Sequence, residues 1–322
     1  MNDASVRPER FDGLPAWRIF SDDGSTALVA ERGATLLSWQ PAEHLELIDS
    51  YADAAGVIDG KERKNLIEAP WVGPMSDGYT FNGRRYDVAE DAAGGLAGSV
   101  DFSGSAAGNA LFLKGRVGGV DSYPWKLALS VVYSLEEGVT DAGRAAHLSV
   151  SVTVTNESST PAPVAIGWRP SICVPGIEDV ANIGLRIPAR TRLASDPRGV
   201  PIPGDLALTG ITSPLVYGYL GRKDVTATFT SLVPRADGVV STTATNAESG
   251  DRVELTQEPS EAPYVRVEAA GSTAGQRSLV IAPASASANA FNRPEQTPRL
   301  SLGAGKVRTL TATLTVPLRE DR

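Results

Sequence analysis

Histidine and cysteine are almost absent from this chain, which has two histidines and one cysteine in 322 residues. A single thiol, Cys173, cannot form an internal disulfide, and one sulfur without clustered histidines cannot build a usual zinc site. We therefore expect no disulfide framework, no metal and no cofactor.

Long apolar runs and dense basic blocks are also lacking. No stretch reaches the roughly 18 apolar residues of a membrane span, and the polar start of the chain has no apolar segment typical of a secretory signal. The formal net charge is −8, and the most basic stretch is the short run KERK at residues 61–64. Because nucleic-acid-binding surfaces cluster Lys and Arg, we expect neither a nucleic-acid nor a membrane partner, and a cytoplasmic location.

Turn-forming residues and alternating strands are abundant. The chain contains 32 Gly and 22 Pro, with 42% hydrophobic and 21% charged residues, which is typical of a globular protein rich in turns. Residues 147–156 (HLSVSVTVTN) and 306–316 (KVRTLTATLTV) alternate apolar with small polar side chains, as half-buried strands do. Further strands are expected at residues 17–20, 27–31, 36–39, 126–133, 225–230, 253–257, 264–267 and 278–281.

Connections between these strands are short. The pair Asn82-Gly83 lies between strand-like flanks and predicts a hairpin over residues 79–88, whereas residues 284–290 (ASASANA) predict a loop. Long amphipathic helices and low-complexity linkers are absent. The sequence therefore predicts one all-β domain over residues 1–322, a large antiparallel sandwich, in which residues 1–14 are a flexible segment.

The order of several segments resembles the galactose mutarotase (aldose 1-epimerase) family, and in particular a bacterial subgroup. The similar segments are GATLLSW (33–39), DGYTFNGRRYDV (77–88), SYPWKLALSVVYSLEEG (122–138), VTVTNESSTPAPVAIGWRP (152–170) and APASASANAFN (282–292). This resemblance implies a β-supersandwich with a sugar-binding cleft. It also implies a reaction in which a His protonates the ring oxygen of an aldose while a Glu removes the anomeric hydroxyl proton.

The catalytic positions of that family are substituted in this chain. The His of the Gly-x-His-Pro motif is replaced by Arg169, and the Glu of the late loop by Ala282. A second His corresponds to Ala97 and a substrate-binding Arg to Pro74. Since an arginine stays protonated and cannot cycle a proton, we expect aldose 1-epimerase activity to be lost or strongly impaired.

Neither histidine of the chain is expected to replace the family's catalytic His. His44 lies in a polar turn and His147 at the start of a strand, so both are away from the positions that the family uses. For His147, a solvated or structural role is favoured over catalysis.

The ligand-binding residues that we expect around the cleft share an aromatic or charged side chain: Trp71, Asp77, Tyr79, Trp168 and Arg169. Aromatic rings stack on the C–H faces of sugars, but they also fill the cores of sandwiches, which is the favoured interpretation for Trp125. Arg169 is either a clamp for an anionic group or part of a structural ion pair with Asp77 or Glu68.

Two functions compete on this basis. The first is a mutarotase-fold protein, a monomer or homodimer, that binds a carbohydrate or a sugar-like metabolite, with a hypothesised preference for an anionic one. The second is an active aldose 1-epimerase, or another isomerase or lyase, that uses residues other than those of the family. A third hypothesis is that the protein is a structural or interaction module whose cleft is vestigial. The fold alone does not separate these functions.

Overall fold

Alternating sequence builds the longest strands of the protein. The structure, a computed structural model, describes residues 5–22, 24–89, 93–141, 143–197, 199–202 and 204–318. Strands β10 (Tyr123–Thr140) and β11 (Gly143–Asn156) form a long antiparallel pair, and β25 (Val307–Pro317) pairs with the other edge of β11. On β11 the valines are fully buried, whereas the serines and threonines between them are half-buried. This is the pattern of a strand with one face on the core.

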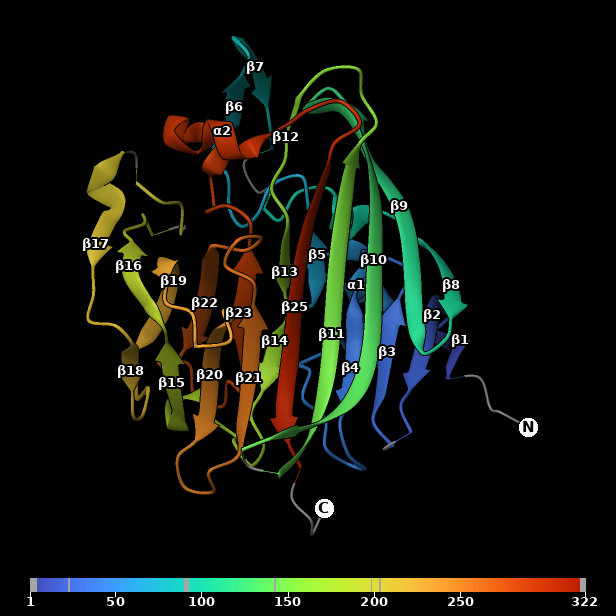
Figure 1. Cartoon of the computed structure of the whole chain (residues 1–322), viewed down its shortest axis with the longest axis vertical. Helices are drawn as coiled ribbons and strands as arrows, with labels where there is room; N and C mark the ends of the chain where they lie inside the picture. Colours follow the sequence, from blue (N-terminus) through green and yellow to red (C-terminus); the bar gives the residue numbers. More distant parts are fainter. Residues whose placement is uncertain are drawn as a thin grey trace.

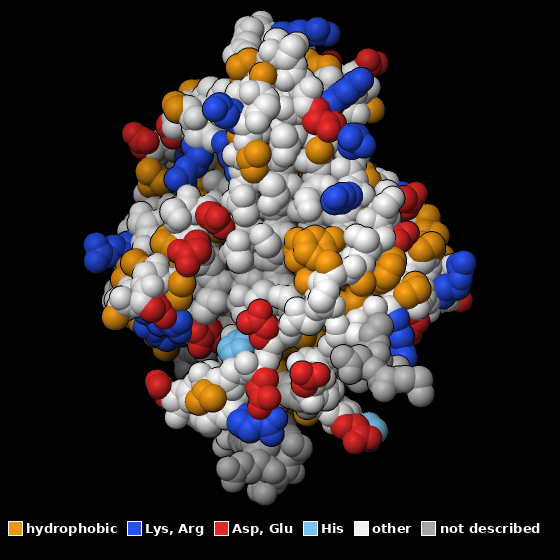
Figure 2. All heavy atoms as spheres, turned by 45° about the vertical axis from the view of Figure 1, so that its right-hand side comes forward, with side chains coloured by type: hydrophobic (Ala, Val, Ile, Leu, Met, Phe, Trp, Pro, Cys, Tyr) orange, Lys and Arg blue, Asp and Glu red, His pale blue; other side chains and the backbone are white. Residues whose placement is uncertain are grey.

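These strands form the centre of a nine-stranded sheet. Its order, over the described residues, is β18-β15-β20-β21-β25-β11-β10-β9-β8. The bounds of the remaining strands are β18 (Leu215–Tyr217), β15 (Ile183–Ile187), β20 (Val240–Asn246), β21 (Arg252–Gln257), β9 (Ala110–Val120) and β8 (Ser103–Ala107). The outer face is rich in serine and threonine, and Figure 2 shows uncoloured polar side chains and backbone running down much of the visible surface.

A second large sheet packs against the inner face of the first. Its order is β17-β16-β19-β22-β23-β13-β5, and β14 also pairs with β23. The strands are β17 (Leu208–Gly210), β16 (Ala189–Leu193), β19 (Asp224–Leu232), β22 (Tyr264–Ala270), β23 (Ser278–Ala284), β13 (Gly167–Arg169), β5 (Leu66–Glu68) and β14 (Ser171–Cys173). Apolar side chains of both sheets belong to one buried cluster.

Smaller elements complete the molecule. A four-stranded sheet contains β1 (Val6–Phe11), β2 (Leu14–Phe20), β3 (Thr26–Ala30) and β4 (Leu36–Gln40). Two-stranded sheets pair β6 (Gly78–Phe81) with β7 (Arg84–Asp87), and β12 (Ala162–Pro163) with β24 (Ser301–Leu302). The helices are short: α1 (Ala54–Asp59), α2 (Thr297–Leu300) and the 3-10 turns η1 (Ala97–Ser99), η2 (Val180–Asn182), η3 (Asp205–Ala207), η4 (Ala290–Asn292) and η5 (Pro294–Gln296).

Figure 1 shows how these parts are arranged. The long strands β9, β10, β11 and β25 run along the height of the molecule, the four-stranded sheet lies at the lower right, and the β6–β7 hairpin and α2 lie at the top. No helix in the described residues has the length and apolar character needed to cross a membrane.

The fold predicted from the sequence is confirmed, with one error near the N-terminus. Each expected strand coincides with an observed one, and the hairpin turn has Asn82 and Gly83 at φ of 50° and 78°. The expectation that residues 1–14 are flexible is wrong for β1 (Val6–Phe11), which pairs with β2 and buries Val6. Residues 1–4 lie outside the described residues.

Candidate functional site

The position of Arg169 follows from the register of β13. Gly167 lies opposite Ala284 of β23 on one side and opposite Glu68 of β5 on the other. Because alternate residues of a strand point to opposite faces, Trp168 points into the core between the sheets and Arg169 points away from it. Trp168 is fully buried, and Arg169 keeps 18% of its side chain exposed.

Arg169 belongs to a triad of charges on this outer face of the second sheet. Its Nη2 lies 2.7 Å from Oε2 of Glu268, and its Nη1 donates to the carbonyl of Arg63. The other oxygen of Glu268 accepts a hydrogen bond from Nε of Arg266 at 2.6 Å. Of the two alternatives for Arg169, a clamp or an ion pair with Asp77 or Glu68, the structure shows an ion pair, but with Glu268, which lies 99 residues away in the sequence.

The two arginines decide the charge state of Glu268. Burial raises the pKa of this carboxyl, but the charges and hydrogen bonds of Arg169 and Arg266 outweigh burial, and the pKa lies below its ordinary value. Glu268 is therefore ionised at neutral pH and compensates both cations. An anionic ligand would have to compete with Glu268 for Arg169.

A second carboxyl lies buried next to the triad. Glu68 is 5% exposed, and both of its oxygens are 3.3 Å from the backbone nitrogen of Gly73. A Cβ at Gly94 would lie 2.8 Å from Oε1, and one at Gly167 would lie 3.1 Å from Oε2, so glycines form the walls around this carboxyl. Burial raises the pKa of Glu68, although the charges of Arg169 and Arg266 oppose the shift.

The other positions at which the resemblance implies catalytic residues carry side chains without proton-transfer chemistry. Ala282 lies in β23 directly opposite Arg266 of β22 and is buried. Ala97 is buried in η1, and Pro74 forms an isolated bridge with Ala93. At each of these positions, then, the observed residue can offer neither an acid nor a base.

A polar pocket of about 250 Å³ opens beside Arg169. We call it the Arg169 pocket, and its lining includes Asp49, Glu62, Lys64, Arg169, Ser171, Thr226, Glu268, Gln276, Ser278 and Val280. Oδ2 of Asp49 accepts a hydrogen bond from Ser278 at 2.7 Å and lies 3.2 Å from Nζ of Lys64. Ser171 and Ser278 are hydrogen-bonded to each other at 3.0 Å. The wall of this pocket carries both donors and acceptors, which are the groups that bind the hydroxyls of a polyol.

Three of the predicted ligand contacts are core residues. Trp71 is 3% exposed, whereas Tyr79 and Trp168 are fully buried. Trp71 meets Phe291 edge to face at 6.3 Å, and the Tyr79 hydroxyl donates to the carbonyl of Ser122 at 2.9 Å. Trp125 is buried as well, as expected. These rings have no face open to a sugar in this structure.

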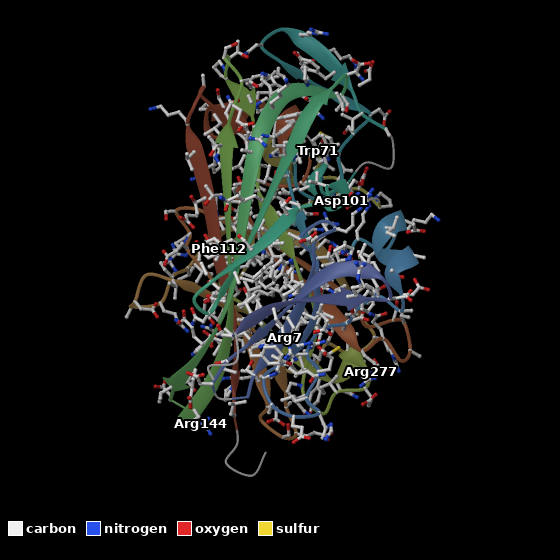
Figure 3. All side chains as sticks on the ribbon, turned by 90° about the vertical axis from the view of Figure 1, so that its right-hand side faces the viewer. Arg7, Trp71, Asp101, Phe112, Arg144 and Arg277 are labelled. Carbon is white, nitrogen blue, oxygen red and sulfur yellow. The ribbon has the colours of Figure 1, made fainter. Side chains whose placement is uncertain are left out.

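Of the five predicted ligand contacts, the structure places Arg169 alone on the wall of the Arg169 pocket. Asp77 is exposed beside the β6–β7 hairpin, and in Figure 3 Trp71 lies in the upper half of the molecule, whereas Arg277, next to Gln276 and Ser278 of the pocket, lies in the lower half. Arg169 is the predicted contact that lines the Arg169 pocket.

Four charged residues of this region were not predicted from the sequence: Glu268, Arg266, Asp49 and Lys64. The first pair had a detectable signal, because the spacing Arg266-Val267-Glu268 in an alternating strand places both charges on one face. Asp49 and Lys64 lie outside regular strands and gave no comparable signal.

The histidines lie outside the site. His44 is exposed with Nε2 3.3 Å from Glu43, and Nδ1 of His147 is 2.8 Å from the hydroxyl of Thr315. Within the described part of the chain, no three His, Cys, Asp or Glu side chains are grouped so as to hold a metal ion.

Comparisons with known proteins agree with this architecture. The chain is similar to a galactose mutarotase-like protein from Clostridium acetobutylicum (14% identity, TM-score 0.77, 99% of this chain and 100% of that chain). It is also similar to the GalM/aldose epimerase homologue from C. elegans (16% identity, TM-score 0.76, 93% and 98%) and to galactose 1-epimerase from Lactobacillus acidophilus (13% identity, TM-score 0.73, 97% and 98%).

A search of curated protein sequences finds no match. The sequence model described as aldose 1-epimerase matches residues 15–213, which is more than half of the chain. On the strength of that match, and with a fold that agrees with it, this chain belongs to the aldose 1-epimerase family.

Proposed function

We propose that this protein binds a carbohydrate or a sugar-like metabolite in the Arg169 pocket without interconverting its anomers. The observation that carries the proposal is the charge triad: at the family's acid position stands an arginine fixed by Glu268 and the Arg63 carbonyl, and its neighbour at the base position is Ala282. One acid or base contributes roughly 10²- to 10⁴-fold to a rate, so loss of both leaves little epimerase activity.

The pocket favours a small neutral ligand over an anion. Both terminal nitrogens of Arg169 are engaged, and Lys64 is paired with Asp49 and Glu62. A volume of about 250 Å³ lies just below the range of roughly 300–1,000 Å³ for drug-sized ligands, which fits a monosaccharide.

One observation favours a second candidate, an epimerase or another isomerase that uses a different acid. Glu68 is a buried carboxyl with a raised pKa. It lies on β5 directly opposite Gly167 of β13, and Gly167 is two residues before Arg169, the family's acid position. Such a carboxyl has the properties of a general acid. In the structure its only hydrogen bonds to the described residues are those from Gly73.

A single set of measurements separates the two candidates. We expect freshly dissolved α-glucose and α-galactose, followed by NMR, to mutarotate at the rate of the buffer alone when the protein is added. We also expect a neutral sugar to raise the melting temperature, because a ligand that binds only the folded state stabilises it. Lys64→Gln should lower the affinity for the sugar roughly tenfold, since it removes a charged hydrogen-bond donor from the pocket. The rise in melting temperature at a given sugar concentration should therefore be smaller.

Lys61→Gln is the matched control, because Lys61 is exposed, three residues away and outside the pocket lining. Its affinity should equal that of the unmodified protein. A clear acceleration of mutarotation that disappears in Glu68→Gln would refute the proposal and establish the second candidate. Stabilisation by uronic acids but by no neutral sugar would refute the neutral-ligand preference.

A further inference from the structure

A second pocket lies at the edge of the molecule, away from Arg169. It has a volume of about 270 Å³ and is formed where the chain leaves β15 of the nine-stranded sheet, passes Pro188 and enters β16 of the other sheet. In Figure 1 these strands lie at the left edge. Three arginines line it, Arg186, Arg190 and Arg235, together with two serines and three prolines, and we call it the arginine pocket.

The charges of the arginine pocket are not balanced. Arg235 is paired with Asp237 at 2.9 Å and with Glu254 at 2.5 Å. The exposed guanidinium groups of Arg186 and Arg190, by contrast, make no ion pair or hydrogen bond with any residue in the described ranges. None of the described residues that line the pocket is acidic. In a chain with a net charge of −8, two uncompensated cations converge here on one small cavity.

The pocket also contains an unused hydrogen-bonding group. Ser241 of β20 is 4% exposed and lines the pocket, and its hydroxyl has no hydrogen-bond partner among the described residues. Because Ser241 lines the pocket, this hydroxyl is free to donate a hydrogen bond to a ligand there. Ser213 adds a second hydroxyl from the loop before β18.

We propose that the arginine pocket binds a phosphate group, either as inorganic phosphate or as the phosphomonoester of a small metabolite. Guanidinium groups match the geometry of phosphate oxygens, and a phosphate carries about −1.5 to −2 charges at pH 7, which balances Arg186 and Arg190. Ser213 and Ser241 supply further donors for its oxygens.

The shape of the pocket limits the rest of the ligand. Pro188, Pro214 and Pro234 form rigid apolar walls, which suit a small organic group on the phosphate. A cavity of about 270 Å³ holds a small molecule and does not form the extended groove that an acidic peptide needs. This site is separate from the Arg169 pocket and does not depend on the proposed function.

Isothermal titration calorimetry on the full chain tests the proposal, with inorganic phosphate, glucose 6-phosphate and glucose as probes. We expect saturable binding of both phosphates that weakens as salt is added, since the attraction is between exposed charges. The double variant R186Q/R190Q should lose roughly tenfold or more in phosphate affinity, because two charge-assisted contacts are removed. Binding of glucose 6-phosphate that is tighter than that of inorganic phosphate and is weakened in R186Q/R190Q would identify a phosphomonoester as the ligand, and equal binding of the two would identify free phosphate.

The double variant R84Q/R85Q is the matched control, because it removes the same charge from the exposed strand β7 at the top of Figure 1. It should bind phosphate as the unmodified protein does. The proposal is overturned if R186Q/R190Q keeps full affinity, or if neither phosphate binds saturably at up to roughly 10 mM. Loss of phosphate binding in Arg169→Gln alone would place the anion in the Arg169 pocket and would also overturn it.

Discussion

At the scale of single residues, Arg169 stands where the family resemblance places a histidine, and its charge determines which groups surround it. A histidine exchanges protons near neutral pH, whereas Arg169 stays charged and needs a permanent partner. Glu268 supplies that partner and binds Arg266 at the same time, and Arg266 stands opposite Ala282. Ala282 and the ion triad are therefore neighbours in one sheet.

The buried carboxyl beside this triad makes stability depend on pH. Because the pKa of Glu68 is raised in the folded protein, its stabilising contribution is complete below the ordinary pKa of about 4.3 and is lost as pH rises through the folded-state pKa. Gln does not titrate and is close to Glu in shape. We therefore expect the stability of Glu68→Gln, relative to the unmodified protein, to increase between pH 4 and pH 8, as measured by urea unfolding. A difference that stays constant with pH would contradict the shift.

At the scale of elements, a bulge between β9 and β10 depends on a glycine. The register of the two strands shifts between Tyr123 and Lys126, and Gly118 lies opposite Lys126 with φ of 96°. A Cβ at Gly118 would lie 1.8 Å from the carbonyl oxygen of Trp125, so an alanine requires the two backbones to separate. We expect Gly118→Ala to reduce the free energy of unfolding by about 3 kcal/mol, from overpacking and from the left-handed backbone together.

Gly108→Ala controls for the backbone contribution alone. Gly108 has φ of 60° in the turn between β8 and β9, and a Cβ there would meet no atom within 4 Å. Its cost should be about 1 kcal/mol, measured by the same chemical unfolding. Equal costs for the two substitutions would mean that the contact with Trp125 relaxes freely.

The elements also show what the sequence could and could not predict. Residues 147–156 alternate strictly, and they form most of β11 (Gly143–Asn156). β1 (Val6–Phe11) escaped prediction because Pro8 and three charged residues hide its pattern, although it pairs along its whole length with β2. Strand β13 has only three residues, so its register, and with it the burial of Trp168, is decided by contacts with β5 and β23 that no local pattern encodes.

At the scale of the whole molecule, the candidate site was predictable only where family motifs exist. The motif around Arg169 contributes one residue to the lining of the pocket, whereas Glu268 and Asp49 come from distant parts of the chain that folding alone brings together. The aromatic chemistry of Trp71 and Tyr79 predicts contact with a sugar, but the same rings fill the core under the β6–β7 hairpin. Aromatic side chains serve both purposes equally well, and only the observed burial separates them.

The shared core predicts that the protein unfolds as one unit. One buried apolar cluster includes Trp39 of the four-stranded sheet, Val131 of the nine-stranded sheet and Ile281 of the second large sheet. The three sheets therefore share a continuous core. Tryptophan fluorescence reports on this core through Trp39 and Trp168, and far-ultraviolet circular dichroism reports on all strands. We expect both signals to give the same midpoint in urea, as a cooperative transition requires. Two separated midpoints would show that one sheet unfolds first and that the chain behaves as more than one domain.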